Sequence, residues 1–253
     1  MFLSEELKCA KQAAIKMGKL QLDNFRRDIK VVRKSAKDLV SNIDMECQRV
    51  AKKMLSESFE YDVVSEEKRF EEKIESNLFW IIDPVDGTHN YISGLPNFGV
   101  SIALASMDEF LLGVIYLPFF EEMYFATKSS GSYMNDEKIH VSSNNDFEKS
   151  LLTYDNQFHL SEETLSIFKK IVNKPFTTRI LGSAVYDFSL IASGRIDARI
   201  CNNAKIFDIA AGISIIEEAG GKVTDFEGNK VKLDTKNIVA SNSIIHNQIL
   251  NEL

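Results

Sequence analysis

The sequence predicts a layered α/β protein, and three observations lead to this fold class. Apolar residues recur at helical spacing near the N-terminus. Strand-like segments separated by turn residues follow between residues 99 and 136. Strands and helices then alternate to the end of the chain, as is typical of layered α/β proteins. We therefore expect one unit over residues 1–253, with a mixed half at about 1–148 and an α/β half at about 149–253.

Helices in the N-terminal half are predicted from apolar periodicity. Ser4 opens the first helix, whose apolar residues are spaced by four and three positions: Leu3, Leu7, Ala10, Ala14 and Met17. The second helix, at about residues 41–59, has one apolar face: Ile43, Cys47, Val50 and Met54. A short helix or loop follows Thr88, before Gly94-Leu95-Pro96 interrupts the pattern.

Strands are predicted from short apolar runs bounded by turn residues. In the N-terminal half we expect them at these places: residues 29–32, 61–64, 78–82, 99–106, 111–117 and 122–127. Turns at Gly131 and Asn135-Asp136 suggest an antiparallel meander. The C-terminal half is expected to run in this order: strand 151–154, helix 161–172, strand 177–181, helix 182–192, strand 197–200, helix 207–218, two short strands and a terminal helix.

The rest of the chain is organised around the stretch from Trp80 to Thr88. An apolar run ends there in two carboxylates three residues apart, Asp83 and Asp86, with Pro84 between them. Unpaired charge is costly to bury, so these acids need a partner, and oxygen ligands favour Mg²⁺, Mn²⁺ or Ca²⁺ over zinc. The alternative is that the pair only forms a turn and caps a helix, because Asp-Pro and Asp-Gly are ordinary turn formers.

Further acids stand where elements begin or end. Glu66 follows strand 61–64, at the start of a charged segment, residues 66–75, that we otherwise expect to be a solvated loop or hairpin. Asp208 starts an apolar helix, where a capping role alone would account for it. Asp44 lies in the first turn of helix 41–59, where it would complement the helix dipole. Since α/β proteins place their chemistry at such ends, we expect the acids to converge.

Composition excludes some classes of protein. The net charge of −7 and the pI near 5.3 argue against non-specific electrostatic binding of nucleic acid. No apolar stretch approaches the roughly 20 residues that span a bilayer, and the N-terminus lacks the pattern of a secretory signal. The 3 cysteines are far apart in the sequence. A reduced, cytoplasmic protein without structural disulfides is the simplest interpretation.

Five segments together resemble the ordered signatures of the inositol monophosphatase family. They cover the chain from about Lys34 to Gly221: residues 38–44 (DLVSNID), 65–67 (SEE), 80–88 (WIIDPVDGT), 182–184 (GSA) and 207–212 (FDIAAG). The resemblance implies an αβαβα sandwich and a single catalytic unit. It also implies a Mg²⁺-dependent, lithium-sensitive phosphomonoesterase that acts on a small phosphorylated substrate, of a family whose members are often dimeric, so we expect a homodimer. From charge and hydropathy we expect neither a membrane nor a nucleic acid as partner.

The resemblance also assigns roles to residues. Glu66, Asp83 and the Val85 carbonyl resemble ligands of a first metal. Asp83, Asp86 and Asp208 resemble ligands of a second, with Asp83 shared, so that two or three Mg²⁺ ions are expected. Asp44, Thr88 and Glu66 are the expected catalytic residues, with Asp44 and Thr88 orienting the attacking water. The expected substrate-binding residues are Glu66, Val85, Asp86, Gly87, Thr88, Gly182, Ser183, Ala184 and Asp208.

The chemistry is consistent with these residue types. A metal-activated water attacks the phosphate in line, a second cation takes charge from the departing alkoxide, and backbone N–H groups of Gly87 and Thr88 meet the phosphate at a helix start. Two positions depart from the family pattern near the last signature. Phe207 replaces the usual tryptophan, and Cys201 replaces a glutamate that often holds a substrate hydroxyl. A thiol is a weak acceptor, so the alcohol portion of the substrate stays open.

Several functions remain open at this stage. The substrate could be inositol monophosphate or a sugar phosphate such as fructose 1,6-bisphosphate, or else histidinol phosphate or 3′-phosphoadenosine 5′-phosphate. In another class, the chain could be a transcription-associated binding protein with a vestigial site. A purely structural Ca²⁺ site fits poorly, because calcium loops draw their ligands from one contiguous segment and these acids are scattered.

Overall fold

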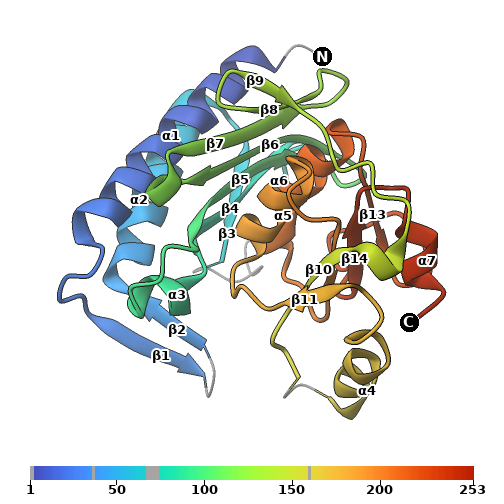
Figure 1. Ribbon diagram of the computed structural model, residues 1–253. Helices are drawn as coiled ribbons and strands as arrows, with labels where there is room; N and C mark the ends of the chain where they lie inside the picture. Colours follow the sequence, from blue (N-terminus) through green and yellow to red (C-terminus); the bar gives the residue numbers. More distant parts are fainter. Residues whose placement is uncertain (1–2, 36–37, 67–73, 159–160) are drawn as a thin grey trace.

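The computed structural model describes residues 3–35, 38–66, 74–158 and 161–253. Two sheets alternate with three layers of helices, as Figure 1 shows, which confirms the expected αβαβα sandwich. The part of the charged segment at residues 67–73 lies outside the described residues.

The first sheet has seven strands in the order β3-β4-β5-β6-β7-β8-β9. Their bounds are β3 Asp62–Ser65, β4 Phe79–Asp86, β5 Gly99–Ala105, β6 Phe110–Leu117, β7 Glu122–Thr127, β8 Ser132–Met134 and β9 Glu137–Ile139. β3 pairs with β4 in parallel, and every later pair is antiparallel. The predicted meander is confirmed, with Asn135 at a turn and Gly131 just before β8.

Helices cover both faces of this sheet. α1 (Ser4–Asn24) and α2 (Asn42–Ser58) form the outer layer, and α5 (Ala184–Ala192) and α6 (Ile206–Glu218) lie on the other face (Figure 1). Alternate residues of β4 therefore face different layers: Trp80 and Ile82 join the core under α1 and α2, whereas Phe79 and Ile81 join the core around α5 and α6. Burial on both faces explains why the run is apolar without alternation.

Glycines bring the middle layer close to its neighbours. A Cβ on Gly113, in β6, would lie 2.3 Å from the Ala211 carbonyl oxygen of α6. A Cβ on Gly212 would lie 2.4 Å from the Phe188 ring of α5. Because neither glycine has a side chain, α6 can pack directly against β6 and α5.

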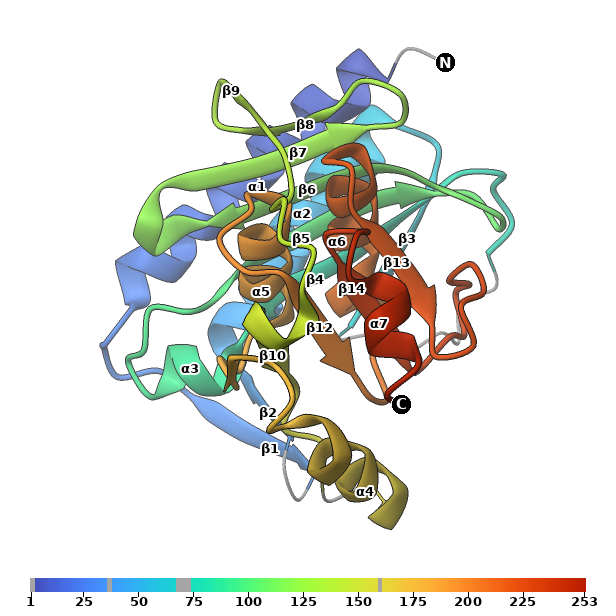
Figure 2. The same ribbon diagram turned by 45° about the vertical axis from the view of Figure 1, so that its right-hand side comes forward.

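The second sheet has five strands in the order β11-β10-β12-β14-β13. Their bounds are β10 Leu151–Tyr154, β11 Thr177–Arg179, β12 Ala198–Cys201, β13 Lys222–Asp225 and β14 Ile238–Ser241. β10 is parallel to β11 and β12, and β14 is antiparallel to β12 and β13. α4 (Glu162–Ile171) and α7 (His246–Leu250) form the last layer, and Figure 2 turns this part of the molecule towards the viewer.

Two smaller parts complete the fold at one end of the first sheet. A hairpin joins β1 (Val31–Ser35) to β2 (Asp38–Ser41), and helix α3 (Thr88–Ile92) follows β4. Two 3₁₀ turns, Pro118–Phe120 and Phe147–Lys149, link other elements. Among the described residues, no helix combines the length and apolar character needed to cross a membrane.

One predicted boundary was wrong, and one strand was missed. The strand at residues 78–82 does not end before the carboxylates, because β4 continues through Asp86, which pairs with Gly99. The pairing with β5 is interrupted between Asp83 and Asp86, where Pro84 offers no N–H group. Strand β2 was not predicted at all: it is four residues long, and its pairing depends on β1.

Candidate active site

Asp83 and Asp86 lie near the end of β4, where the pairing with β5 becomes irregular. Asp83 is 2% exposed and accepts a hydrogen bond from the Val85 N–H at 3.0 Å. The chain then turns at Gly87, whose φ of 82° lies in the left-handed region. A Cβ on Gly87 would also lie 2.7 Å from the Asn97 carbonyl oxygen, so the turn from β4 into α3 requires glycine.

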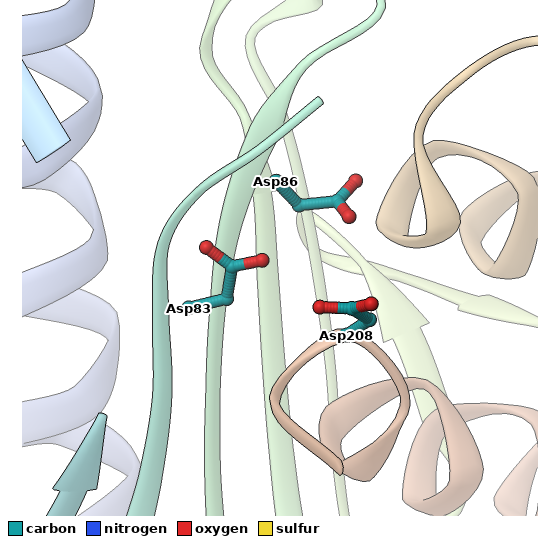
Figure 3. A group of neighbouring side chains, drawn as sticks. All are labelled: Asp83, Asp86 and Asp208. Carbon is teal, nitrogen blue, oxygen red and sulfur yellow. The ribbon is translucent and has the colours of Figure 1, made fainter. Parts of the chain in front are cut away.

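Asp208 meets these acids from the other side. It lies in the first turn of α6, after Lys205, and its side chain points back towards the end of β4 (Figure 3). Asp83, Asp86 and Asp208 each offer a carboxylate oxygen, and these oxygens all lie within 4.8 Å of one another. The structure therefore brings together three acids from two segments that are far apart in the sequence.

Asp86 also organises the start of α5. Its carboxylate accepts hydrogen bonds from the Ser183 hydroxyl and, at 3.1 Å, from the Val185 N–H. Ser183 is the N-cap of α5 and accepts from the Tyr186 N–H. Gly182, Ser183 and Ala184 line the same cavity as Asp86 and Asp208. The segment that we expected only at the substrate thus also holds a predicted metal ligand in place, which the sequence did not indicate.

Asp44 and Thr88 come together as expected. Asp44 is 1% exposed and forms a capping box with Ser41 at the start of α2. Its other carboxylate oxygen lies 3.1 Å from the Thr88 hydroxyl, which also lies 2.8 Å from the Val85 carbonyl oxygen. Asp44 therefore fulfils the capping role that its position suggested and, in addition, reaches across to the turn after β4.

Glu66 lies beside the three clustered acids but pairs with a cation. It follows β3 directly, and its carboxylate Oε1 lies 2.8 Å from the Lys205 Nζ. Lys205 is the N-cap residue of α6, three positions before Asp208. The negative charge of Glu66 is felt by both Asp83 and Asp208. In the structure, an ammonium group thus occupies one side of the predicted metal site.

The electrostatics of the acids call for a counter-charge. Burial, followed by the charges of Glu66 and Asp86, raises the pKa of Asp83 well above its usual value. Burial and then Glu66 do the same to the pKa of Asp208. Burial also raises the pKa of Asp86 and of Asp44, although their hydrogen bonds with Ser183 and Ser41 oppose the shift. Such shifts are typical of functional sites.

The donor atoms suit a hard divalent cation. All the converging side chains are carboxylates, and the group contains neither thiolate nor imidazole. Mg²⁺ prefers oxygen ligands, and a cation at this place would relieve the mutual repulsion that raises the pKa values of Asp83 and Asp208. The residues present therefore fit the metal that the resemblance implies.

A cavity of about 120 Å³ opens between the acids and the second sheet. One wall, which we call the carboxylate side, contains Asp86 and Asp208. Another part of the lining, which we call the amide side, consists of the loops that follow β10 and β12 and contains Asn156, Gln157, Asn202 and Asn203. The cavity has the polar character of a site for a small, hydroxyl-bearing molecule.

Sequence reasoning missed two ionisable residues of this cavity. Asp155 is the first residue after β10 and is 7% exposed, and Arg199 of β12 is 5% exposed and pairs with Asp187 of α5. The signal that found Asp83, an acid directly after a strand, also applies to Asp155. Cys201 lies between them on β12, and burial raises the pKa of its thiol to about 12, so it is protonated at neutral pH. All three cysteines are free thiols.

Comparisons with known proteins agree with the geometry. The model of the inositol monophosphatase family matches residues 3–253. A fructose-1,6-bisphosphatase/inositol-1-monophosphatase from Thermotoga maritima is 35% identical over 237 residues, which cover 93% of this chain and 90% of that protein. The Nus factor SuhB of Pasteurella multocida is 32% identical, with 98% and 95% covered. The solved structure of the extragenic suppressor protein SuhB from Bartonella henselae matches with a TM-score of 0.91 at 31% identity, covering 98% of each chain.

Proposed function

Because the chain belongs to the inositol monophosphatase family, we propose that it is a Mg²⁺-dependent phosphatase of small phosphorylated alcohols. The proposal depends on one observation: carboxylate oxygens of Asp83, Asp86 and Asp208 lie within 4.8 Å of one another. The hydrogen-bonded pair of Asp44 and Thr88 belongs to the same end of β4. Scattered acids that only capped helices would have no reason to converge on one cavity. Since the acids come from the N-terminal half and the C-terminal half, we also propose that residues 1–253 act as one catalytic unit.

We assign the metal ligands from the resemblance and from the charges. Asp83, Asp86, Asp208, Glu66 and the Val85 carbonyl would hold two Mg²⁺ ions, with a third ion as an alternative. When bound, the ions supply a Lewis acid that neutralises phosphate charge and lowers the pKa of a water molecule. Glu66 would exchange its ion pair with Lys205 for this role.

The other residues would position the reacting atoms. The Thr88 hydroxyl lies between Asp44 and the Val85 carbonyl oxygen and would accept a hydrogen bond from the attacking water. As the water loses its proton to the Thr88 oxygen, the Thr88 hydroxyl would pass its own proton to the Asp44 carboxylate. The Gly87 and Thr88 N–H groups at the start of α3 bind the phosphate oxygens. The alcohol then leaves towards Gly182, Ser183 and Ala184 and the amide side of the cavity.

A substrate panel tests the proposal. Purified protein with Mg²⁺ is offered inositol 1-phosphate, fructose 1,6-bisphosphate, histidinol phosphate and 3′-phosphoadenosine 5′-phosphate, and phosphate release is measured. We expect release from inositol 1-phosphate or a sugar phosphate, since none of the lining residues that the structure describes offers an aromatic surface for adenine. Failure to release phosphate from any member, in protein shown by calorimetry to bind Mg²⁺, would overturn the proposal.

The SuhB relatives favour a second candidate function. Nus factor SuhB proteins are 32% identical to this chain over nearly its whole length, so a transcription-associated binding protein is the alternative. A pull-down with wild type and Asp83→Asn separates the two. Equal recovery of RNA polymerase or ribosomal factors by both proteins would support the alternative, and recovery by neither would remove it.

We further propose a cytoplasmic homodimer. Large apolar side chains are exposed at Leu95, Phe119 and Phe120, and such side chains are enriched at interfaces between subunits. Light scattering after gel filtration measures the mass directly. A mass of about 57 kDa is expected for twice the 28.6 kDa chain, and a mass near 28.6 kDa would overturn the dimer.

A further inference from the structure

The amide side of the cavity contains one buried carboxylate. Asp155 is one of the lining residues and directly follows β10, whose neighbour in the sheet is β12. Its N–H donates to the Ile200 carbonyl oxygen at 3.3 Å, so the residue continues the pairing of the two strands. The side chain is therefore placed by the second sheet, independently of the three acids at the end of β4.

The Asp155 carboxylate is held by two backbone donors. Oδ1 accepts from the Gln157 N–H at 3.0 Å, and Oδ2 accepts from the Asn202 N–H. A carboxylate has about four acceptor positions. The Cys201 thiol donates to the same carboxylate and takes a third position, which leaves one for a further donor. The two backbone bonds fix the orientation of the group in the wall of the cavity, which is the condition for selective recognition of a hydroxyl.

Among the lining residues that the structure describes, the neighbours of Asp155 on the amide side supply one cation and no further anion. The Cys201 thiol is protonated, because burial raises its pKa to about 12. The cation is Arg199, whose guanidinium pairs with the fully buried Asp187 and whose charge also acts on Asp155, so two carboxylates share one positive charge. The other groups on this side are neutral amides. A hydroxyl donor is thus favoured near Asp155, whereas a second phosphate would be repelled.

We propose that Asp155 is a specificity-determining residue whose carboxylate accepts a hydrogen bond from a hydroxyl of the alcohol portion of the substrate. This inference rests on the proposed phosphatase function and narrows it. The preferred substrate is the monophosphate of a polyhydroxy alcohol, and compounds with a second phosphate at this end are disfavoured. The acceptor is provided by β10, because the nearby position on β12 is occupied by Cys201.

Kinetics on matched probes test the inference. The probes are myo-inositol 1-phosphate and p-nitrophenyl phosphate, whose leaving group has no alcohol hydroxyl, and both are assayed with Mg²⁺. For Asp155→Asn we expect kcat/KM on inositol phosphate to fall about 10- to 100-fold, mainly through KM, because one charge-assisted hydrogen bond is weakened. On p-nitrophenyl phosphate we expect a change of less than about twofold.

A control variant separates recognition from folding. Asp197→Asn removes a buried carboxylate that accepts from the Leu151 N–H at 2.8 Å in the same sheet but does not line the cavity. It should affect both probes equally. A further readout is fructose 1,6-bisphosphate, whose kcat/KM relative to inositol phosphate should rise in Asp155→Asn, an effect that loss of stability would not produce.

The outcomes are distinguishable. If Asp155→Asn loses activity in parallel on both aryl and inositol probes, or keeps full activity on inositol phosphate, the inference is wrong. The same holds if wild type cleaves p-nitrophenyl phosphate but not inositol phosphate. If wild type cleaves neither probe, the proposed phosphatase function fails, and the inference fails with it.

Discussion

The two sides of the cavity are built differently. The carboxylate side comes from the end of a fully buried strand, β4, and the first turn of a buried helix, α6, both packed into the same core. The amide side comes from loops after β10 and β12, where Asn156 and Asn203 are exposed. If the proposed roles hold, the hydrolysis depends on one part of the fold and the selection of the alcohol on another, so substitutions could change either property without the other.

The largest expected effect belongs to the carboxylate side. Asp83→Asn should lower kcat/KM at least about 1,000-fold on every substrate, because it removes a proposed metal ligand and a negative charge from the site. The loss should not depend on the alcohol, in contrast to Asp155→Asn. Metal-free Asp83→Asn should also melt at a higher temperature than metal-free wild type, because mutual repulsion of the acids is relieved.

Phosphate release and calorimetric melting without metal check this prediction, with Asp197→Asn as the control. If Asp83→Asn lowers kcat/KM on one substrate only, the carboxylate side also contributes to the choice of alcohol, and the proposed division of roles between the two sides is wrong.

The second largest effect concerns the layer behind the amide side. His246 is fully buried between the hydroxyls of Thr224 and Ser241, each 2.8 Å from a ring nitrogen. Burial lowers its pKa from 6.5 to about 4, so the folded state favours the neutral ring. As the pH falls below 6.5, the imidazole of His246 is protonated in the unfolded state before it is protonated in the folded state. The contribution of the neutral, buried imidazole to the free energy of unfolding is therefore lost between pH 6.5 and about 4. The loss amounts to about 3 kcal/mol.

Urea unfolding at several pH values measures this loss. Other groups titrate as well, so the relevant quantity is the difference between wild type and His246→Asn. That difference should favour wild type at pH 7 and shrink towards pH 4. A constant difference would contradict the shifted pKa.

A smaller effect is expected where the two halves meet. Gly113→Ala places a methyl group against the Ala211 carbonyl oxygen of α6, and overpacking of this kind costs about 1–3 kcal/mol. Because α6 carries Asp208, we expect weaker Mg²⁺ binding together with the lower stability. Thermal melting and calorimetry measure the two. If the variant is less stable but binds Mg²⁺ with unchanged affinity, the position of Asp208 at the start of α6 does not depend on the contact between α6 and β6.

The smallest effect tests the ion pair at the edge of the carboxylate side. Lys205→Met removes the ammonium that pairs with Glu66 and repels incoming cations. We expect Mn²⁺ to bind about 3- to 10-fold more tightly by calorimetry, which corresponds to about 1 kcal/mol. Lys53→Met, which removes an exposed ion pair with Glu57 on α2, should leave the affinity unchanged. If Lys205→Met binds Mn²⁺ with equal or lower affinity than wild type, Lys205 does not compete with the cation for Glu66.

The carboxylate side could be predicted from sequence because its signals are local. An apolar run that ends in Asp83 and Asp86 marks a buried strand with charges at its end. The meeting with Asp208 followed from the rule that chemistry gathers at element ends, together with the family resemblance. The layered fold followed from periodicity in the same way, and the family match extends it over the chain.

The amide side could not be predicted to the same extent, because its contacts depend on the placement of the second sheet. Nothing near Asp155 in the sequence indicates that Asn202 will donate to it from the loop after β12. The pairing of Lys205 with Glu66 likewise joins segments 139 positions apart. Strand β2 was missed for a similar reason, since its hydrogen bonds come from β1 rather than from its own pattern.

The close approach at Gly113 has a consequence for the size of the ion that the proposed site could hold. Asp83 belongs to the first sheet and Asp208 to α6, so the distance between their carboxylates depends on the gap between these two layers. At Gly113 that gap is set by the main chain of Ala211, and closely packed main-chain atoms compress very little. A site tuned in this way would favour one ionic radius, and a preference for a larger cation would require substitutions at the contact between β6 and α6, away from the carboxylates themselves.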